Sequence, residues 1–212
     1  MRLLTVGDSF TYGEELSNKE LAWPNLIAMQ LRYNLTNLAE PGSGNTRMVR
    51  NLLEHVKDYD IVIIAWSHFA RMEFADDCGI YDTWPGHTGI FFKGRLSYRT
   101  KLLEYISKHH NDSYLYRQYL INIILVQHYL KANNKKFIML DTFGNTYTIE
   151  RKSNQDLIDQ IDKELFLGWP NESMMDWTYS TAKGPNGHFL EDGHERVADK
   201  IYEHIRNLGW VS

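Results

Sequence analysis

Short apolar runs alternate with amphipathic segments along this chain, and the pattern predicts strands that alternate with helices. Apolar runs of four to seven residues, bounded by polar or turn-forming residues, are typical of buried strands. Such runs lie at residues 3–6, 35–38, 60–66 and 136–140. Helices are predicted over residues 23–31, 46–56, 114–133, 156–165 and 191–206, where apolar residues recur mainly at helical spacing.

The order of these segments predicts the fold class. Strand, helix, strand, helix and strand within the first 66 residues indicate βαβ units and a parallel sheet in one α/β layered domain over residues 1–212. Residues 60–66 (DIVIIAW) are apolar almost throughout, as in a strand covered on both faces. Two stretches interrupt the rhythm: an aromatic-rich excursion at about 72–100 and an irregular stretch at about 142–187.

Composition and charge narrow the classes of function. Hydrophobic residues make up 43% of the chain and charged residues 24%, as in ordinary globular domains. The net charge of −4, without a Lys/Arg-rich tract, argues against nucleic-acid binding. A single cysteine, Cys78, excludes an internal disulfide framework and a cysteine-rich metal site. Because no apolar run suits a signal peptide or a membrane span, we expect a cytoplasmic protein without a membrane partner.

Three predicted loops at the carboxyl ends of strands carry polar residues, and ligands of parallel sheets bind at that edge. These loops contain Gly7-Asp8-Ser9, Ser43-Gly44-Asn45 and Ser67-His68. A serine after a buried strand can act as a nucleophile if a base lies within hydrogen-bond reach and N–H groups stabilise the oxyanion. The alternative interpretation of Ser9 is a buried helix cap.

Three blocks of the sequence resemble the SGNH (GDSL-type) hydrolases. Residues 7–13 (GDSFTYG) are similar to the first block, whose serine is the nucleophile. Residues 41–46 (PGSGNT) are similar to the second block, whose glycine N–H helps to form the oxyanion hole, and Gly44 best fits that role. Residues 188–198 (HFLEDGHERVA) resemble the last block, in which the catalytic histidine stands five residues before a glycine, as His188 does.

The resemblance implies a three-layer α/β/α sandwich with a mainly parallel, flavodoxin-like sheet. It also implies acyl-ester hydrolysis by Ser9 and His188 without a metal or cofactor. The oxyanion would be held by the N–H groups of Ser9 and Gly44. Residues 72–187 are not matched by these motifs, and their aromatic-rich composition looks like that of SGNH-type proteins encoded by tailed bacteriophages.

The sequence departs from the family pattern at two positions. The third block of the family supplies an asparagine to the oxyanion, but residues 65–69 read AWSHF. His68 or Ser67 could donate from the same place; if neither does, a binding protein is favoured over an enzyme. The family's aspartate stands three residues before the histidine, where this chain has Pro185. The histidine must then be oriented by another carboxylate, by a backbone carbonyl, or not at all. The candidate carboxylates are Asp141, Asp176 and Asp192.

Structural interpretations compete with the catalytic ones. Asp8 is predicted to accept backbone N–H groups beside its turn, and Asn45 to cap the following helix. His194 is predicted to form a structural hydrogen bond in the first turn of the last helix. His68 is equally compatible with a donor in the site and with a histidine satisfied in the core. A metal site built from His68, His188 and His194 is disfavoured because no closely spaced ligand pair supports it.

The sequence therefore predicts a serine esterase that hydrolyses a small acyl ester, such as an acetyl ester, with a carbohydrate as a plausible alcohol. Aromatic residues of the excursion could stack on a sugar ring or simply pack onto the domain. The alternative is a weakened or inactive SGNH-fold protein with a binding or structural role, for example in a phage virion. The oligomeric state stays open.

Overall fold

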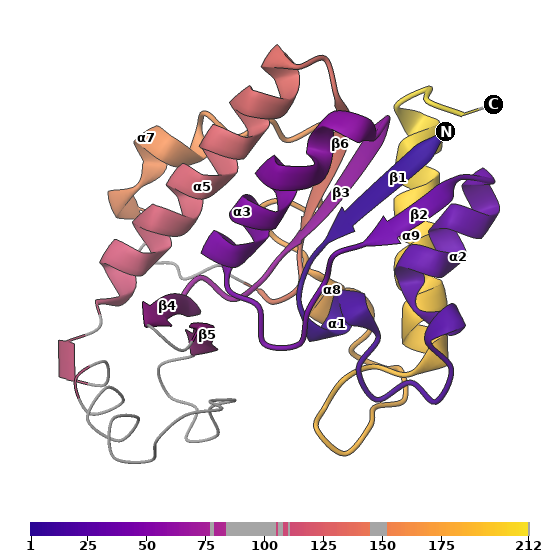
Figure 1. Ribbon diagram of the computed structural model, residues 1–212, viewed down its shortest axis with the longest axis horizontal. Helices are drawn as coiled ribbons and strands as arrows, with labels where there is room; N and C mark the ends of the chain where they lie inside the picture. Colours follow the sequence, from indigo (N-terminus) through magenta and orange to yellow (C-terminus); the bar gives the residue numbers. More distant parts are fainter. Residues whose placement is uncertain (77–78, 84–104, 106–107, 110, 145–151, 212) are drawn as a thin grey trace.

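The structure is a computed structural model that describes all residues except 77–78, 84–104, 106–107, 110, 145–151 and 212. Its centre is a parallel sheet of five strands in the order β2-β1-β3-β6-β7 (Figure 1). The strands are β1 (Arg2–Val6), β2 (Asn34–Asn37), β3 (Ile61–Trp66), β6 (Lys136–Asp141) and β7 (Phe166–Leu167). The predicted α/β fold with a parallel sheet is confirmed, and β7 is a short strand that the apolar pattern did not indicate.

Helices cover both faces of the sheet. They are α1 (Ser9–Tyr12), α2 (Trp23–Leu31), α3 (Asn45–His55), α5 (Asp112–Ala132), α7 (Gln155–Ile158), α8 (Met174–Trp177) and α9 (Glu191–Asn207), with 3₁₀ turns η1 (Lys19–Leu21) and η2 (Val56–Asp58). The helix predicted over 156–165 ends early at Ile158. Beyond it the chain turns, and the Asp162 N–H donates to the Gln127 side chain of α5 at 2.7 Å.

Alternate residues of each strand point into two separate cores, because successive side chains of a strand face opposite sides of the sheet. On one face, Leu4 and Val6 of β1 pack with α3 and α5. On the other face, Leu3 of β1 packs with α2 and α9. All six residues of β3 are buried, which explains its unbroken apolar sequence. The result is the three-layer arrangement visible in Figure 1.

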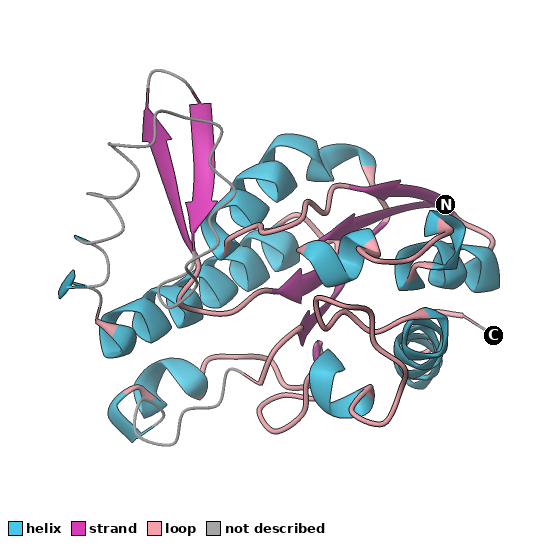
Figure 2. Cartoon of the chain, turned by 90° about the horizontal axis from the view of Figure 1, so that it is seen from below, coloured by secondary structure: helices cyan, strands magenta, loops and turns pink. Residues whose placement is uncertain are grey.

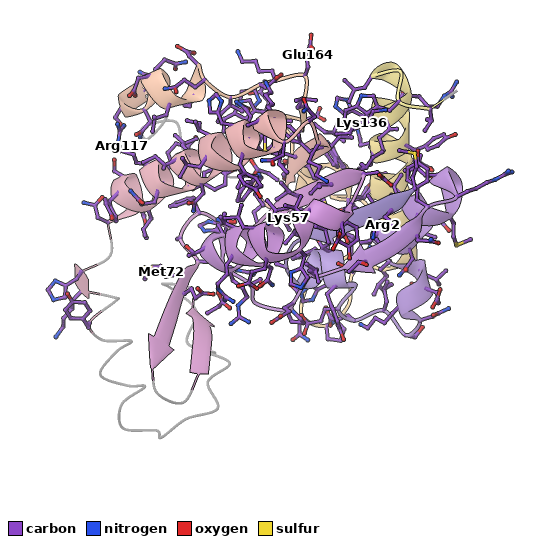
Figure 3. The ribbon with its side chains drawn as sticks, turned by 45° about the horizontal axis from the view of Figure 1, so that its top comes forward. Arg2, Lys57, Met72, Arg117, Lys136 and Glu164 are labelled. Carbon is purple, nitrogen blue, oxygen red and sulfur yellow. The ribbon has the colours of Figure 1, made fainter. Side chains whose placement is uncertain are left out.

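A two-stranded antiparallel hairpin stands apart from the main sheet, as seen from below in Figure 2. It consists of β4 (Met72–Asp76) and β5 (Gly79–Thr83), within the stretch that the sequence analysis described only as an aromatic-rich excursion. In Figure 3, Met72 lies far from Arg2 and Lys136, which begin the central strands β1 and β6. Residues 84–100 of the expected excursion lie outside the described part.

The hairpin is fastened to α3 by ion pairs. Glu73 of β4 pairs with Arg50 at 2.7 Å, and Asp82 of β5 pairs with the Nε of Arg47 at 2.6 Å. Arg47 also reaches the exposed Glu40 at 2.7 Å. These contacts are made by charged side chains, so the apolar pattern alone gives no sign of the docked hairpin.

The connections create a switch point between β1 and β3. From β1 the chain moves to β2 on one side of it and then to β3 on the other side. The connections that leave β1 and β3 therefore run in opposite directions along the sheet. Ligands of open α/β sheets bind at such points. Within the described part of the chain, no helix has the length and apolar character needed to cross a membrane.

Candidate active site

Ser9 is the first residue of α1, immediately after the turn that ends β1. Asp8 is the N-cap, and its side chain accepts the Phe10 N–H at 3.1 Å, which starts the helix and fixes the serine. Ser9 is only 3% exposed, yet its Oγ lies 2.9 Å from the Nε2 of His188. The structure therefore joins residues from opposite ends of the chain at the sheet edge, as nucleophilic catalysis requires.

His188 is presented by a tight loop that precedes α9. The Gly184 N–H donates to the His188 carbonyl at 2.8 Å, and Gly187 adopts the left-handed conformation with φ of 87°. The imidazole ring packs against the Phe10 ring, with centroids 4.6 Å apart. Phe10 is thus a neighbour of both Ser9 in sequence and His188 in space, and it limits the orientations that the imidazole can take.

Glu15, which the sequence argument did not single out, is the acid at the far nitrogen of His188. Its Oε2 lies 2.8 Å from Nδ1 and also accepts the His188 backbone N–H at 3.1 Å. Its Oε1 accepts the backbone N–H of Asn186 at 2.8 Å and that residue's side-chain amide at 3.2 Å. Because the carboxylate accepts, Nδ1 carries the proton and Nε2 faces the Ser9 hydroxyl as an acceptor.

The charge of Glu15 is stabilised by these contacts. Desolvation alone raises the pKa of the carboxyl, but hydrogen bonds from Asn186 and His188 outweigh it and hold the Glu15 pKa below its ordinary value. The side chain is 9% exposed. Glu15 is therefore a carboxylate that accepts hydrogen bonds from the loop and keeps its negative charge.

The local backbone explains why a residue so close to Ser9 in sequence reaches His188. Gly13 ends α1 in the left-handed region with φ of 79°, and Glu15 itself has φ of 69°, which is rare for a residue with a side chain. Gly184 leaves room for the carboxylate, since a Cβ there would stand 2.7 Å from the Glu15 Cδ. Strain of this kind, held by surrounding contacts, is typical of functional sites.

The three aspartates considered from sequence bond to other groups. Asp141, at the end of β6, accepts the Tyr119 hydroxyl. Asp176 accepts the Ser173 N–H at 2.9 Å as part of the capping box of α8. Asp192 accepts the Gly193 N–H at 2.9 Å in the first turn of α9. Of the possibilities that the sequence left open, a carboxylate lies at Nδ1 of His188, but it belongs to Glu15 and not to any of the three candidate aspartates.

Gly44 is the N-cap of α3, and its backbone N–H already has an acceptor. It donates to the Oδ1 of Asp82 at 2.9 Å, while the other carboxylate oxygen of Asp82 faces Arg47. Burial raises the pKa of Asp82, and the Gly44 N–H and Arg47 oppose that effect. The donor predicted for the oxyanion is therefore held by a carboxylate of the β4–β5 hairpin.

Ser67 does not present its hydroxyl to the predicted oxyanion position. The side chain is fully buried, and Oγ donates its single proton to the Oδ2 of Asp8 at 2.8 Å. Arg71 reaches the same Asp8 oxygen at 3.1 Å. Burial raises the pKa of Asp8, although Arg71 and the Ser67 hydroxyl favour its charged form. Asp8 accepts the Phe10 N–H, as predicted, and its bond with Ser67 uses the hydroxyl proton that Ser67 would need to donate to an oxyanion.

His68 follows β3 at the switch point. Its Nδ1 accepts the Ala70 N–H at 3.2 Å, so in the neutral ring the proton is on Nε2. Burial, aided by the charge of Arg71, lowers the His68 pKa to about 4. The ring stacks on Phe69 with centroids 4.5 Å apart and lies 6.0 Å from the ring of Phe143. Phe143 in turn packs edge-on against Phe10, which connects His68 to the His188 side of the site.

Two other predicted polar residues have structural contacts. Asn45 is the first residue of α3, after the Gly44 cap, and its side chain clamps the Ser67 backbone, accepting the N–H at 2.9 Å and donating to the carbonyl at 3.2 Å. His194 accepts the Trp23 N–H at 3.1 Å in the first turn of α9, and burial lowers its pKa to about 3. Among the described residues, no group of three His, Cys, Asp or Glu side chains is arranged to hold a metal ion.

The series Ser9–His188–Glu15 has the geometry of a Ser-His-acid hydrolytic site, and the surrounding fold is that of the SGNH hydrolases. TesA matches 98% of this chain and 99% of its own, with a TM-score of 0.61 and 12% identity. The psychrotrophic esterase EstA from Pseudoalteromonas sp., in a structure inhibited by monoethylphosphonate, matches 98% and 97%, with a TM-score of 0.56 and 14% identity. At such identities the likeness establishes the fold.

A family two carbohydrate esterase from Clostridium thermocellum, in complex with cellohexaose, has a TM-score of 0.56 and 14% identity, and the match spans 99% of this chain but 65% of the enzyme. Residues 11–212 match the family of unknown function DUF6071, and the chain belongs to that family. No curated protein sequence matches. The resemblance to bacteriophage proteins finds no support in these matches and stays a prediction.

Proposed function

We propose that this chain is a serine esterase in which Ser9 is the nucleophile, His188 the general base and Glu15 the acid that orients His188. The observation that carries the proposal is the continuous hydrogen-bonded series from Ser9 Oγ to His188 at 2.9 Å and from His188 to Glu15 at 2.8 Å. The similarity of the fold to that of esterases supports the same reaction class.

In the acylation step, Ser9 Oγ attacks the ester carbonyl while Nε2 of His188 takes its proton. The tetrahedral intermediate then collapses: the bond to the alcohol oxygen breaks, and the same nitrogen delivers the proton to that oxygen. Water, activated by His188 in the same way, hydrolyses the acyl-serine and releases a carboxylic acid. Throughout, Glu15 keeps its negative charge and stabilises the imidazolium, since its pKa lies below the ordinary value.

The oxyanion requires N–H donors at the end of β1 and the start of α3. The proposed donors are the backbone N–H groups of Ser9 and Gly44 together with the Nε2–H of His68, whose neutral tautomer follows from its bond to Ala70. The Gly44 N–H donates to the Oδ1 of Asp82. Catalysis with this donor therefore requires the substrate oxygen to replace the Asp82 carboxylate, whose like charge would otherwise oppose the oxyanion.

For the substrate, we propose a small acyl ester such as an acetyl ester, with a carbohydrate as a candidate alcohol. The structural similarity to a carbohydrate esterase crystallised with cellohexaose supports this class. The alternative is a binding or structural protein that retains the fold, and the aligned Ser9–His188–Glu15 series favours the esterase over it.

The test is turnover and covalent labelling of the purified chain. We expect 4-nitrophenyl acetate to be hydrolysed, and an organophosphate ester to stop the reaction with one adduct per chain on the peptide that contains Ser9. Ser9→Ala should lower turnover by at least about 10³-fold and abolish the adduct. Ser17→Ala, at an exposed serine in the same region, is the matched control and should behave as the unmodified chain.

Equal turnover by the unmodified chain and Ser9→Ala would overturn the proposal. Absence of both turnover and labelling, in a chain shown to be folded by circular dichroism, would favour the alternative of a binding or structural protein.

A further inference from the structure

Glu14 lies beside the nitrogen of His188 that exchanges the proton. Its Oε2 is 3.6 Å from Nε2, whereas Glu15 contacts Nδ1 on the other side of the ring. Two consecutive glutamates therefore bracket one imidazole. Their exposures differ: the Glu14 side chain is 33% exposed and that of Glu15 only 9%. Glu14 thus lies on the more solvent-accessible side of the imidazole, and none of the steps proposed for Ser9, His188 and Glu15 uses it.

The backbone holds Glu14 in this place. Its N–H donates to the Ser9 carbonyl at 2.9 Å, directly after the left-handed Gly13, so Glu14 closes the turn that carries the nucleophile. The next residue, Glu15, turns into the left-handed region and sends its side chain to the opposite nitrogen. The spacing between the Glu14 carboxylate and the site is consequently set by local chain geometry.

The distance excludes Glu14 as the partner that orients His188. At 3.6 Å it exceeds hydrogen-bond length, and Nε2 has the Ser9 hydroxyl at 2.9 Å. What Glu14 contributes is a negative charge. Nε2 is the atom that hands the proton to the departing alcohol, so this charge lies on the side where the alcohol portion of an ester must sit. Among the described residues, His188 is the only basic side chain with a nitrogen within 4.0 Å of the Glu14 carboxylate.

We propose that Glu14 is a specificity-determining residue that selects esters by the charge of their alcohol portion. Esters of neutral, hydroxyl-rich alcohols are accepted, because a carboxylate can accept hydrogen bonds from hydroxyl groups. Esters whose alcohol carries a carboxylate or phosphate near the ester bond are disfavoured by repulsion. This inference rests on the proposed esterase function and narrows its substrate class.

The experiment compares two acetate esters with similar chromogenic leaving groups: neutral 4-nitrophenyl acetate and anionic 5-acetoxy-2-nitrobenzoate. The readout is the ratio of kcat/KM for the anionic ester to that for the neutral ester. We expect Glu14→Gln to raise this ratio about threefold to tenfold, a modest factor because the carboxylate is partly exposed and screened. Glu14→Lys should raise it further, and 0.5 M salt should shrink both effects.

Glu20→Gln, at an exposed glutamate a few residues away, is the matched control and should leave the ratio unchanged. If neither Glu14 variant changes the ratio while hydrolysis still depends on Ser9, the inference about Glu14 is overturned and the esterase function stands. If Ser9→Ala hydrolyses both esters at the unmodified rate, the proposed function itself fails. The two failures are therefore distinguishable.

Discussion

The two halves of the candidate site differ in how their hydrogen bonds are used. On the proton-transfer side, Ser9, His188 and Glu15 contact one another in series, and the loop before α9 wraps its own N–H groups around the Glu15 carboxylate. On the oxyanion side, the Gly44 N–H and the Ser67 hydroxyl each donate to a carboxylate of the protein, Asp82 and Asp8 respectively.

The groups of the candidate site are therefore preorganised on the proton-transfer side but not on the oxyanion side. The proton-transfer groups need no partner from outside to be aligned, whereas a substrate carbonyl must compete for the Gly44 donor. Preorganised donors that stabilise the oxyanion are commonly the largest single contribution to acyl-transfer catalysis. We therefore expect variants on the two sides to change turnover in opposite directions.

The largest effect is expected from Glu15→Gln. An amide can still occupy the space, but it cannot stabilise the imidazolium or enforce the Nδ1–H tautomer, so turnover should fall by about 10² to 10⁴-fold. The measurement is kcat on 4-nitrophenyl acetate. Asp176→Asn is the control, because that aspartate caps α8 and should change turnover little. Near-normal turnover in Glu15→Gln would show that the proton-transfer side does not depend on its acid.

The next largest effect is an expected increase in turnover, in the Asp82→Ala variant. Asp82→Ala removes the carboxylate that accepts the Gly44 N–H, so we expect turnover to rise about tenfold to 100-fold, up to the lower end of the roughly 10² to 10³-fold that one oxyanion donor contributes. Glu73→Gln serves as the control, since it weakens an ion pair between hairpin and α3 without touching Gly44 directly. A fall in turnover for Asp82→Ala alone would mean that the hairpin builds the oxyanion side instead of withholding its donor.

The smallest effect concerns stability on the oxyanion side. Burial lowers the His68 pKa to about 4. As the pH falls, His68 is therefore protonated near pH 6.5 in the unfolded chain but only near pH 4 in the folded chain. The free energy of unfolding should therefore fall as pH decreases between these values, and His68→Gln should reduce that slope by at most about 1.4 kcal/mol per pH unit.

Urea unfolding at pH 4.5, 5.5 and 6.5, followed by tryptophan fluorescence, measures this slope. The buried His194 contributes in the same direction and should keep part of the slope in His68→Gln. His55→Gln, at an exposed histidine, provides the reference. A slope identical in His68→Gln and the unmodified chain would contradict the neutral, buried state of His68.

The strands and the main helices could be predicted from sequence because their apolar periodicity follows from burial. Residues 60–66 illustrate this: a strand covered on both faces has nearly continuous apolar residues, and β3 proved fully buried. The β4–β5 hairpin escaped prediction because it is attached through charges such as Glu73 and Asp82, which carry no periodic signal.

The contact between Ser9 and His188 could be anticipated from motifs, but their neighbours could not. Glu15 reaches His188 because its backbone adopts the left-handed conformation. The residue type does not predict this conformation, since glutamate rarely adopts it. The one available clue was the pair of acids directly after the first motif, together with the missing aspartate at Pro185. The bond from Ser67 to Asp8 likewise depends on two strands being adjacent in the sheet.

The origin of the acid in the same turn as the nucleophile has a mechanical consequence. Ser9 and Glu15 are separated only by the short segment that closes α1, so thermal motion of the segment before α9 cannot pull them apart. Such motion would withdraw the imidazole together with the loop N–H groups that Glu15 accepts, and the imidazole would lose its contacts with Ser9 and Glu15. The Ser9–Glu15 segment and the loop that carries His188 should therefore associate and separate as two units. The site is then either complete or without its histidine.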